Sequence, residues 1–134
     1  MATNQEIIDR AGMELGMIED SDSMGSTDSA DALTVLNEMM DEWRYSGKDF
    51  NWFSQDTLGD TIPTPDWAKS GIISNLAVKC GPVFRAPVTA ELQKKADDGR
   101  NFVTRTMMNL NLQRADMTHL PQGRYYNNNI LTDA

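Results

Sequence analysis

The sequence predicts an all-α protein: a small four-helix bundle with an aromatic loop between helices 2 and 3 and an extended C-terminal arm. Four segments repeat apolar residues at three- and four-residue steps, which is the period of a helix with one buried face. Residues 48–65 lack this period and are expected to form an extended loop or a short hairpin. A polar tail with Pro, Gly and an Asn run follows the fourth segment. We therefore assign residues 1–112 to a helical bundle domain and residues 113–134 to the arm.

The first helix is expected to follow Thr3. Thr3 and Glu6 have the spacing of a capping box, in which each side chain bonds the backbone N–H of the other residue. Gly16 suits the left-handed position that commonly ends a helix. The side chains expected on the buried face are Ile7, Ile8, Ala11 and Leu15.

The second helix has the densest apolar pattern, within the stretch from Asp31 to Phe50. Asp28 or Ser29 is expected to cap its N-terminus, because Asp and Ser side chains accept hydrogen bonds from the free backbone N–H groups there. Gly47 is expected to end it. The predicted buried face consists of Ala32, Leu33, Leu36, Met39, Met40 and Trp43.

The third helix is expected from about Asp66 to Cys80, and a Gly-Pro pair at positions 81–82 is expected to end it. Thr64 fits the N-cap and Pro65 fits the first helical position, where a missing N–H costs nothing. The side chains expected to point inward are Trp67, Ile72, Ile73, Leu76, Ala77 and Cys80.

The fourth helix is the longest, expected from about Pro87 to Leu112. Glu91 and Lys95 are spaced for a favourable ion pair one turn apart on its outer face. Its predicted buried stripe consists of Val88, Leu92, Ala96, Gly99, Val103, Met107 and Leu110.

Length and composition limit the classes of protein to consider. A chain of 134 residues fits one domain, and its single cysteine, Cys80, excludes an internal disulfide. No apolar run approaches the roughly 20 residues that span a bilayer, and the N-terminal segment lacks the features of a signal peptide. We therefore expect a soluble protein with no membrane partner.

The net charge of −8 is unevenly distributed. Residues 1–66 contain 15 acidic and 3 basic residues, whereas residues 67–134 contain 5 acidic and 9 basic residues. Opposite patches of this kind can orient subunits against one another. The alternative is that both halves are solvated helix faces, whose charges contribute little.

The segment from Asp20 to Asp31 resembles an EF-hand calcium loop, with Asp at the first, third and ninth positions and Gly at the sixth. Met24 stands where an oxygen ligand is usual, and Asp31 replaces the bidentate Glu. A calcium-binding helix-loop-helix module is therefore an alternative to an Asp- and Ser-rich turn that caps the second helix.

The sequence gives little support for catalysis, a cofactor or a metal site. The only histidine, His119, lies in the polar tail, and neither a Gly-rich phosphate loop nor a Cys/His cluster for zinc is present. We expect no enzyme activity; a carboxylate-dependent hydrolase acting on cell-wall sugars is a weaker alternative, which requires two buried carboxyl groups facing a cleft. Tight DNA binding is not expected either, because the chain is acidic and its clustered basic residues do not form one stripe. These basic residues are Lys94, Lys95, Arg100, Arg105 and Arg114.

The tail carries the strongest functional signal. It places bulky side chains in a segment that has little means of folding alone, and aromatic and Arg residues dominate interface hot spots. We expect the tail to order on a partner, by adding a strand or by filling grooves; the alternative is a disordered terminus. The residues expected to bind the partner are Pro121, Arg124, Tyr125, Tyr126, Ile130 and Leu131.

Taken in order, four stretches resemble the head-to-tail connector proteins of short-tailed bacteriophages, also called adaptor, tail accessory or packaged-DNA-stabilising proteins. The stretches are IIDRAGMELG, ALTVLNEMMDEWRYSG, SNLAVKCGPVFRAPVTAELQKKADDGRNFV and LPQGRYYNN. They span nearly the whole chain, and each is a packing pattern. Cys80-Gly81-Pro82 departs from the family, which often has Ala-Pro at that place.

The resemblance implies a structural virion protein that forms a ring, expected to be a dodecamer, under the portal vertex after genome packaging. Such a ring extends the DNA channel, helps to retain packaged DNA and provides a platform for the tail. The implied partners are the portal protein, a tail nozzle or other tail protein, and neighbouring copies of the chain, while DNA passes through without specific binding. The implied location is the connector region of the virion, and the host cytoplasm during assembly.

Overall fold

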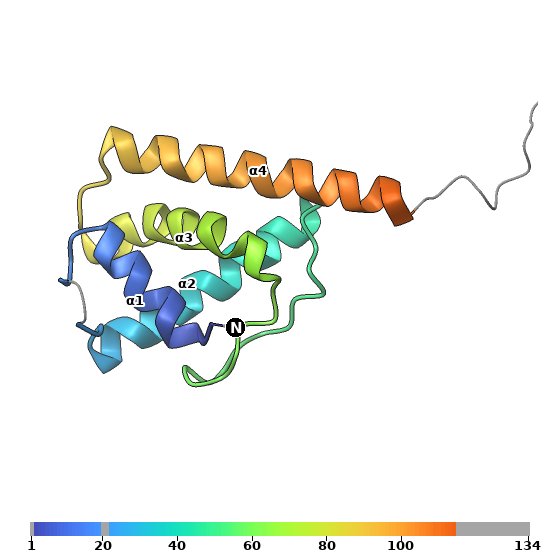
Figure 1. Ribbon diagram of the computed structural model, residues 1–134. Coiled ribbons are helices and arrows are strands. Elements are labelled where there is room, and N and C mark those ends of the chain that lie inside the picture. Colours follow the sequence, from blue (N-terminus) through green and yellow to red (C-terminus); the bar gives the residue numbers. More distant parts are fainter. Residues whose placement is uncertain (1, 20–21, 115–134) are drawn as a thin grey trace, which may run out of the picture.

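The computed structural model describes residues 2–19 and 22–114, which fold into four α-helices (Figure 1). These are α1 (Asn4–Glu14), α2 (Ser26–Tyr45), α3 (Lys69–Phe84) and α4 (Ala90–Arg114), with a 3-10 turn, η1 (Asp66–Ala68), before α3. The predicted all-α four-helix bundle is confirmed. Within the described residues, β pairing is limited to a single antiparallel bridge between Thr3 and Thr61.

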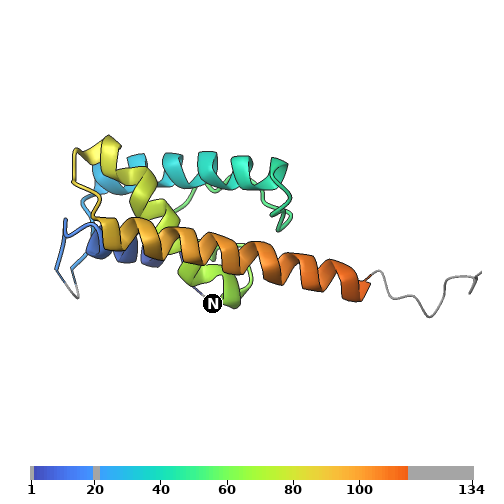
Figure 2. The same ribbon diagram turned by 90° about the horizontal axis from the view of Figure 1, so that it is seen from above.

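Helix α3 lies in the centre and contacts each of the other three helices. Helix α4 runs along α3, and its C-terminal turns extend past the rest of the bundle in both views (Figures 1 and 2). The bundle therefore has a free end, and this end leads directly into the segment predicted to be the arm.

Helix α1 begins and ends as the sequence predicts. The Thr3 hydroxyl accepts from the backbone N–H of Glu6, and the Glu6 carboxylate accepts from the N–H of Thr3, at 3.2 and 2.9 Å. Gly16 adopts a φ of +76° directly after the C-cap residue, Leu15. Ile7, Ile8 and Ala11 are buried and Leu15 is half-buried.

The predicted buried face of α2 is confirmed, because all six of its apolar residues are buried. The predicted N-cap is wrong: the helix begins at Ser26, with Gly25 as its N-cap. Ser29 lies one turn inside and is buried, where its hydroxyl donates to the carbonyl of Met24 and accepts from the amide of Gln5. Asp28 lies in the first turn, where its negative charge interacts favourably with the positive end of the helix dipole.

The loop between α2 and η1 is fixed by buried side-chain amides rather than by strands. Asn37 makes two bonds to the backbone of Gln55, donating to its carbonyl at 3.0 Å and accepting from its N–H at 2.9 Å. Asn4, at the start of α1, donates to the Gln55 side chain at 3.0 Å and to the carbonyl of Thr57 at 2.9 Å. These bonds hold the loop between α1 and α2, with Trp52 and Ile62 buried beneath it.

The predicted ends of the third helix are wrong. Thr64 is buried and caps nothing, and η1, whose N-cap is Pro65, precedes α3. The helix also continues through Pro82 to Phe84 and ends at Arg85, which adopts a left-handed φ of +56°. Gly81 does not end the helix but allows Val88 to pack closely against α3, because a Cβ at position 81 would lie 2.5 Å from Cγ2 of Val88. The inward residues are placed as predicted, with Trp67 half-buried and the others buried.

Helix α4 begins at Ala90, three residues later than expected, because Thr89 caps it by accepting from the N–H of Leu92 at 3.1 Å. Lys95 pairs with Glu14 of α1, so the predicted pair with Glu91 is wrong. The helix continues to Arg114, so the predicted domain boundary at residue 112 lies inside it. In the predicted stripe, three residues are fully buried and four are half-buried: Leu92, Ala96 and Val103, and then Val88, Gly99, Met107 and Leu110.

Helices α3 and α4 touch through their backbones at Gly71 and Gly99. A Cβ on Gly71 would lie 2.9 Å from the carbonyl oxygen of Gly99, and a Cβ on Gly99 would lie 2.8 Å from Cα of Gly71. Next to this contact, the buried Asn75 side chain donates to the carbonyls of Gly71 and Ala96, at 2.8 and 2.9 Å. The amide therefore links α3 to α4 where only glycine allows the helices to approach.

We expect Gly99→Ala to lower the free energy of unfolding by about 1–3 kcal/mol, because the atoms that a methyl group meets are backbone and cannot rotate away. Urea unfolding followed by circular dichroism measures this change. Gly59→Ala is the matched control, since nothing lies within 4 Å of a Cβ at Gly59. Equal midpoints for the two variants would contradict the proposed close contact.

Candidate functional site

The residues predicted to bind a partner lie outside the described part of the chain. These are Pro121, Arg124, Tyr125, Tyr126, Ile130 and Leu131, and His119 lies there too. The described segment nearest to them in the sequence is the C-terminal end of α4.

The tip of α4, defined as residues 102–112, exposes apolar side chains outside the predicted stripe. Met108 and Leu112, one turn apart, are 59 % and 66 % exposed. Phe102 is 47 % exposed and makes an edge-to-face contact with Trp67, with ring centroids 6.3 Å apart. Since Met107 and Leu110 lie half-buried on the inner side, the tip is apolar on several faces, as is usual for a helix that becomes buried in an assembly.

A groove of about 150 Å³ lies beneath this tip, between α4 and the loop before α3. Phe50 and Trp67 form its aromatic wall, with ring centroids 5.8 Å apart, and Met107 and Leu110 line it from α4. The sequence pattern placed Met107 and Leu110 in the core-facing stripe, where both are half-buried. It missed Met108 and Leu112, although their i,i+4 spacing on an otherwise polar face is the signal of a second apolar edge.

The two charged halves of the sequence contact each other within a single chain. The Lys79 ammonium of α3 lies 2.9 Å from the Glu42 carboxylate of α2, and Lys95 of α4 pairs with Glu14 of α1. On α4 itself, Lys94 pairs with Asp98 at 3.8 Å and Arg100 with Asp97 at 3.1 Å. Part of the opposite charge is therefore neutralised internally, while α2 keeps an exposed acidic face at Asp31, Glu38 and Asp41.

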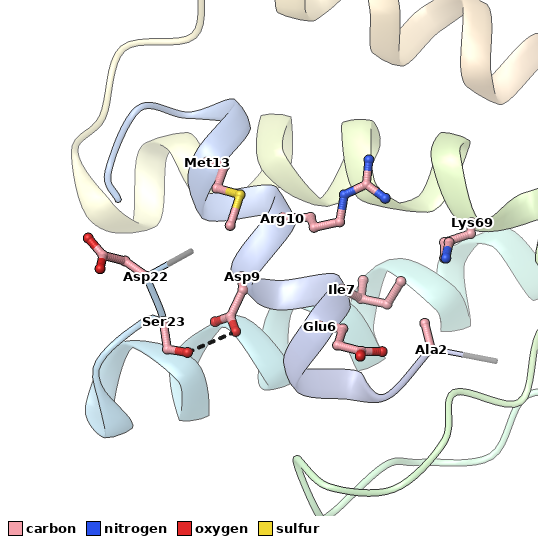
Figure 3. Close-up of a pocket in the computed structure, with 9 residues that line it drawn as sticks. All are labelled: Ala2, Glu6, Ile7, Asp9, Arg10, Met13, Asp22, Ser23 and Lys69. Atoms are coloured by element: carbon pink, nitrogen blue, oxygen red, sulfur yellow. Dashed lines mark hydrogen bonds between the residues drawn. The ribbon is translucent and has the colours of Figure 1, made fainter. Parts of the chain in front are cut away.

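A cavity of about 420 Å³ forms an open groove along the exposed side of α1 (Figure 3). Asp9 projects into it and accepts three hydrogen bonds: from Gln5 at 2.7 Å, from the Met24 backbone N–H at 3.0 Å and from the Ser23 hydroxyl at 3.2 Å. The carboxylate thus ties the 22–24 segment to α1 and has a structural role. The Asp and Glu residues among those the structure describes are all exposed or half-buried, so the buried pair that a cell-wall hydrolase requires is not found there.

The segment that resembles a calcium loop is only partly a loop. Its second half, from Ser26 to Asp31, is the first part of α2, so these residues cannot wrap around an ion as the second half of an EF-hand loop does. Over residues 2–19 and 22–114, no group of three His, Cys, Asp or Glu side chains is placed to hold a metal ion. The geometry does not favour the calcium alternative.

Comparisons with known proteins give no assignment: no family model matches the chain, and no curated protein matches it. Among the helices that the structure describes, none is long and apolar enough to cross a membrane.

Cys80 is buried in α3, and this burial raises the pKa of its thiol to about 12. Thiols react as thiolates, and at pH 8 roughly one in ten thousand Cys80 side chains would be ionised. We therefore expect the folded protein to resist Ellman's reagent at pH 8, whereas the urea-unfolded chain should release one equivalent of chromophore. Rapid labelling of the folded chain would show that the thiol is accessible.

Proposed function

We propose that this chain is a structural virion protein, a head-to-tail adaptor of a short-tailed bacteriophage. In this proposal it forms a ring under the portal, extends the DNA channel, helps to retain packaged DNA and provides a platform for tail attachment. The order of the four stretches that resemble such connectors supports it. Among the described residues, the observation that carries it is the tip of α4, which extends past the bundle with Met108 and Leu112 uncovered and leads into the arm.

The bundle suits a subunit of a closed ring. Helices α1 to α3 and the inner face of α4 share one core, and the C-terminal end of α4 extends beyond the other helices (Figure 2). We propose that this end contacts a neighbouring copy or the portal. A contact between different faces of identical subunits produces a ring when the rotation closes. The proposed partners are neighbouring copies, the portal protein above and a tail protein below.

The exposed acidic face of α2 is proposed to line the DNA channel. Its carboxylates at Asp31, Glu38 and Asp41 would repel the phosphate backbone, which keeps passing DNA from adhering. DNA is therefore expected to move through the ring without specific contacts. A ring structure with a basic channel would contradict this assignment.

Deletion of residues 121–134 tests the arm. The bundle core lies within residues 2–107, so the truncated chain should keep its helical circular dichroism spectrum and its melting temperature. Binding to purified portal rings, measured by light scattering and electron microscopy, should be lost, because the proposed anchors Arg124, Tyr125 and Tyr126 are removed. Unchanged portal binding would reject the arm as the docking element.

Replacement of the exposed apolar side chains tests the tip of α4. The double variant Met108→Glu, Leu112→Glu should fold normally, because both side chains face solvent in a single subunit. Burying two carboxylates in a subunit contact should reduce assembly on portal rings at least tenfold. Ala90→Glu, at an exposed position in the first turn of the same helix, is the control and should assemble normally. Equal assembly of both variants would exclude the tip from the interface.

A further inference from the structure

A further cavity, of about 320 Å³, lies where the C-terminal end of α2 meets α3 and α4. Lys48, Lys79 and Arg100 reach it from three different segments, and Glu42 is the one carboxylate that lines it. The cavity wall therefore has a net positive charge in a chain whose net charge is −8. The sign of the charge on the cavity wall is therefore opposite to that of the chain as a whole.

The end of α2 forces Lys48 into this cavity. Gly47 adopts a φ of +90°, and the backbone N–H of Lys48 donates to the carbonyl of Trp43 at 2.8 Å, five residues back. This is the main hydrogen bond of a Schellman helix end, which brings the residue after the glycine into contact with the residue three positions before the cap. Because Trp43 is buried, Lys48 is drawn inward with it and is only 8 % exposed.

Among the described residues, none of opposite charge pairs with the ammonium group of Lys48. Its Nζ donates one hydrogen bond to the Ser46 hydroxyl at 3.0 Å and lies 5.6 Å from the Trp43 ring centroid. No carboxylate lies within 4.0 Å of it among the residues placed by the structure. An ammonium has three donors, so two remain for a ligand in the cavity. A buried lysine without a paired charge is rare, because desolvation of the charge is costly.

Arg100 adds a second positive charge to the same space. Burial lowers the pKa of Lys48 below its ordinary value, and the nearby positive charge of Arg100 lowers this pKa further by a smaller amount. The other charges at the cavity do not relieve this repulsion: Glu42 pairs with Lys79, and Asp97 with one terminal nitrogen of Arg100. A guanidinium has five donors, so Arg100 retains donors for a further acceptor.

Close backbone packing holds the α3 and α4 walls of the cavity together. Arg100 directly follows Gly99, which touches Gly71 backbone to backbone, and Asn75 links α3 to α4 beside the cavity. The distance between the α4 wall and the α3 wall is therefore set before any ligand arrives. Such preorganisation lowers the entropy lost on binding.

We propose that this cavity binds a single oxyanion, a carboxylate or a phosphate group, between Lys48 and Arg100. An oxyanion there would accept from both cations at once and turn their mutual repulsion into attraction. Charge-assisted hydrogen bonds of this kind are strong, and they replace the water that the buried ammonium has lost. The oxyanion has two sources: a free ion such as phosphate, or an acidic side chain from a second copy of this acidic chain.

The test is titration of the full-length chain with inorganic phosphate at constant ionic strength, followed by calorimetry and by the shift in melting temperature. The wild-type chain should bind saturably. Lys48→Met, which keeps the apolar stem but removes the charge, should bind about tenfold more weakly or worse. Arg100 reaches the cavity from the opposite wall, so Arg100→Gln should weaken phosphate binding as well. This second variant keeps the proposal testable if Lys48→Met fails to fold.

Lys94→Met is the matched control, since the Lys94 ammonium is exposed on the outer side of α4 and should not affect binding. Light scattering with and without phosphate separates the two sources. A phosphate-bound chain of unchanged mass indicates a free ion, whereas a Lys48-dependent oligomer that phosphate dissociates indicates a carboxylate from a second copy. If neither phosphate binding nor oligomer mass changes in Lys48→Met and Arg100→Gln, the proposal is overturned.

Discussion

The backbone contact between Gly71 and Gly99 is the constraint on which most of this structure depends. It places α4 directly against α3, and α3 in turn packs against α1, α2 and η1. The Asn75 amide completes the contact by satisfying carbonyls on both helices. The direction of α4 fixes where its tip leaves the bundle and where Arg100 faces the cavity, so both proposed binding features follow from one pair of glycines.

The helical period predicted the core well, because a helix that packs on one side must repeat its apolar residues on that side. Ile7, Leu36 and Val103 lie buried where the pattern placed them. The pattern failed where long-range neighbours decide the outcome. The Ser29 hydroxyl lies inside α2 and accepts a hydrogen bond from the side chain of Gln5, 24 residues away, so it does not cap the helix. Helix α3 continues for two residues past Pro82, although proline lacks the N–H that would bond the carbonyl of Val78.

The candidate sites were less predictable than the fold. The glycine at position 47 was read correctly as a helix end, yet its consequence for Lys48 depends on the burial of Trp43 and on Arg100, which is 52 positions later. The apolar residues on the tip of α4 matter only because the helix continues beyond the body that would otherwise cover them. Sequence periodicity describes one helix at a time, and each site depends on where the end of one helix lies relative to the rest of the bundle.

The facing glycines also limit how this interface can change over generations. A methyl group on either one would push the helices apart, and a second methyl on its partner would then enter a gap already opened. The two penalties should therefore not add, as is common for residues in direct contact. Any lineage that replaces both glycines must pass through a weakened form, which favours retaining the pair or losing the Asn75 link together with it.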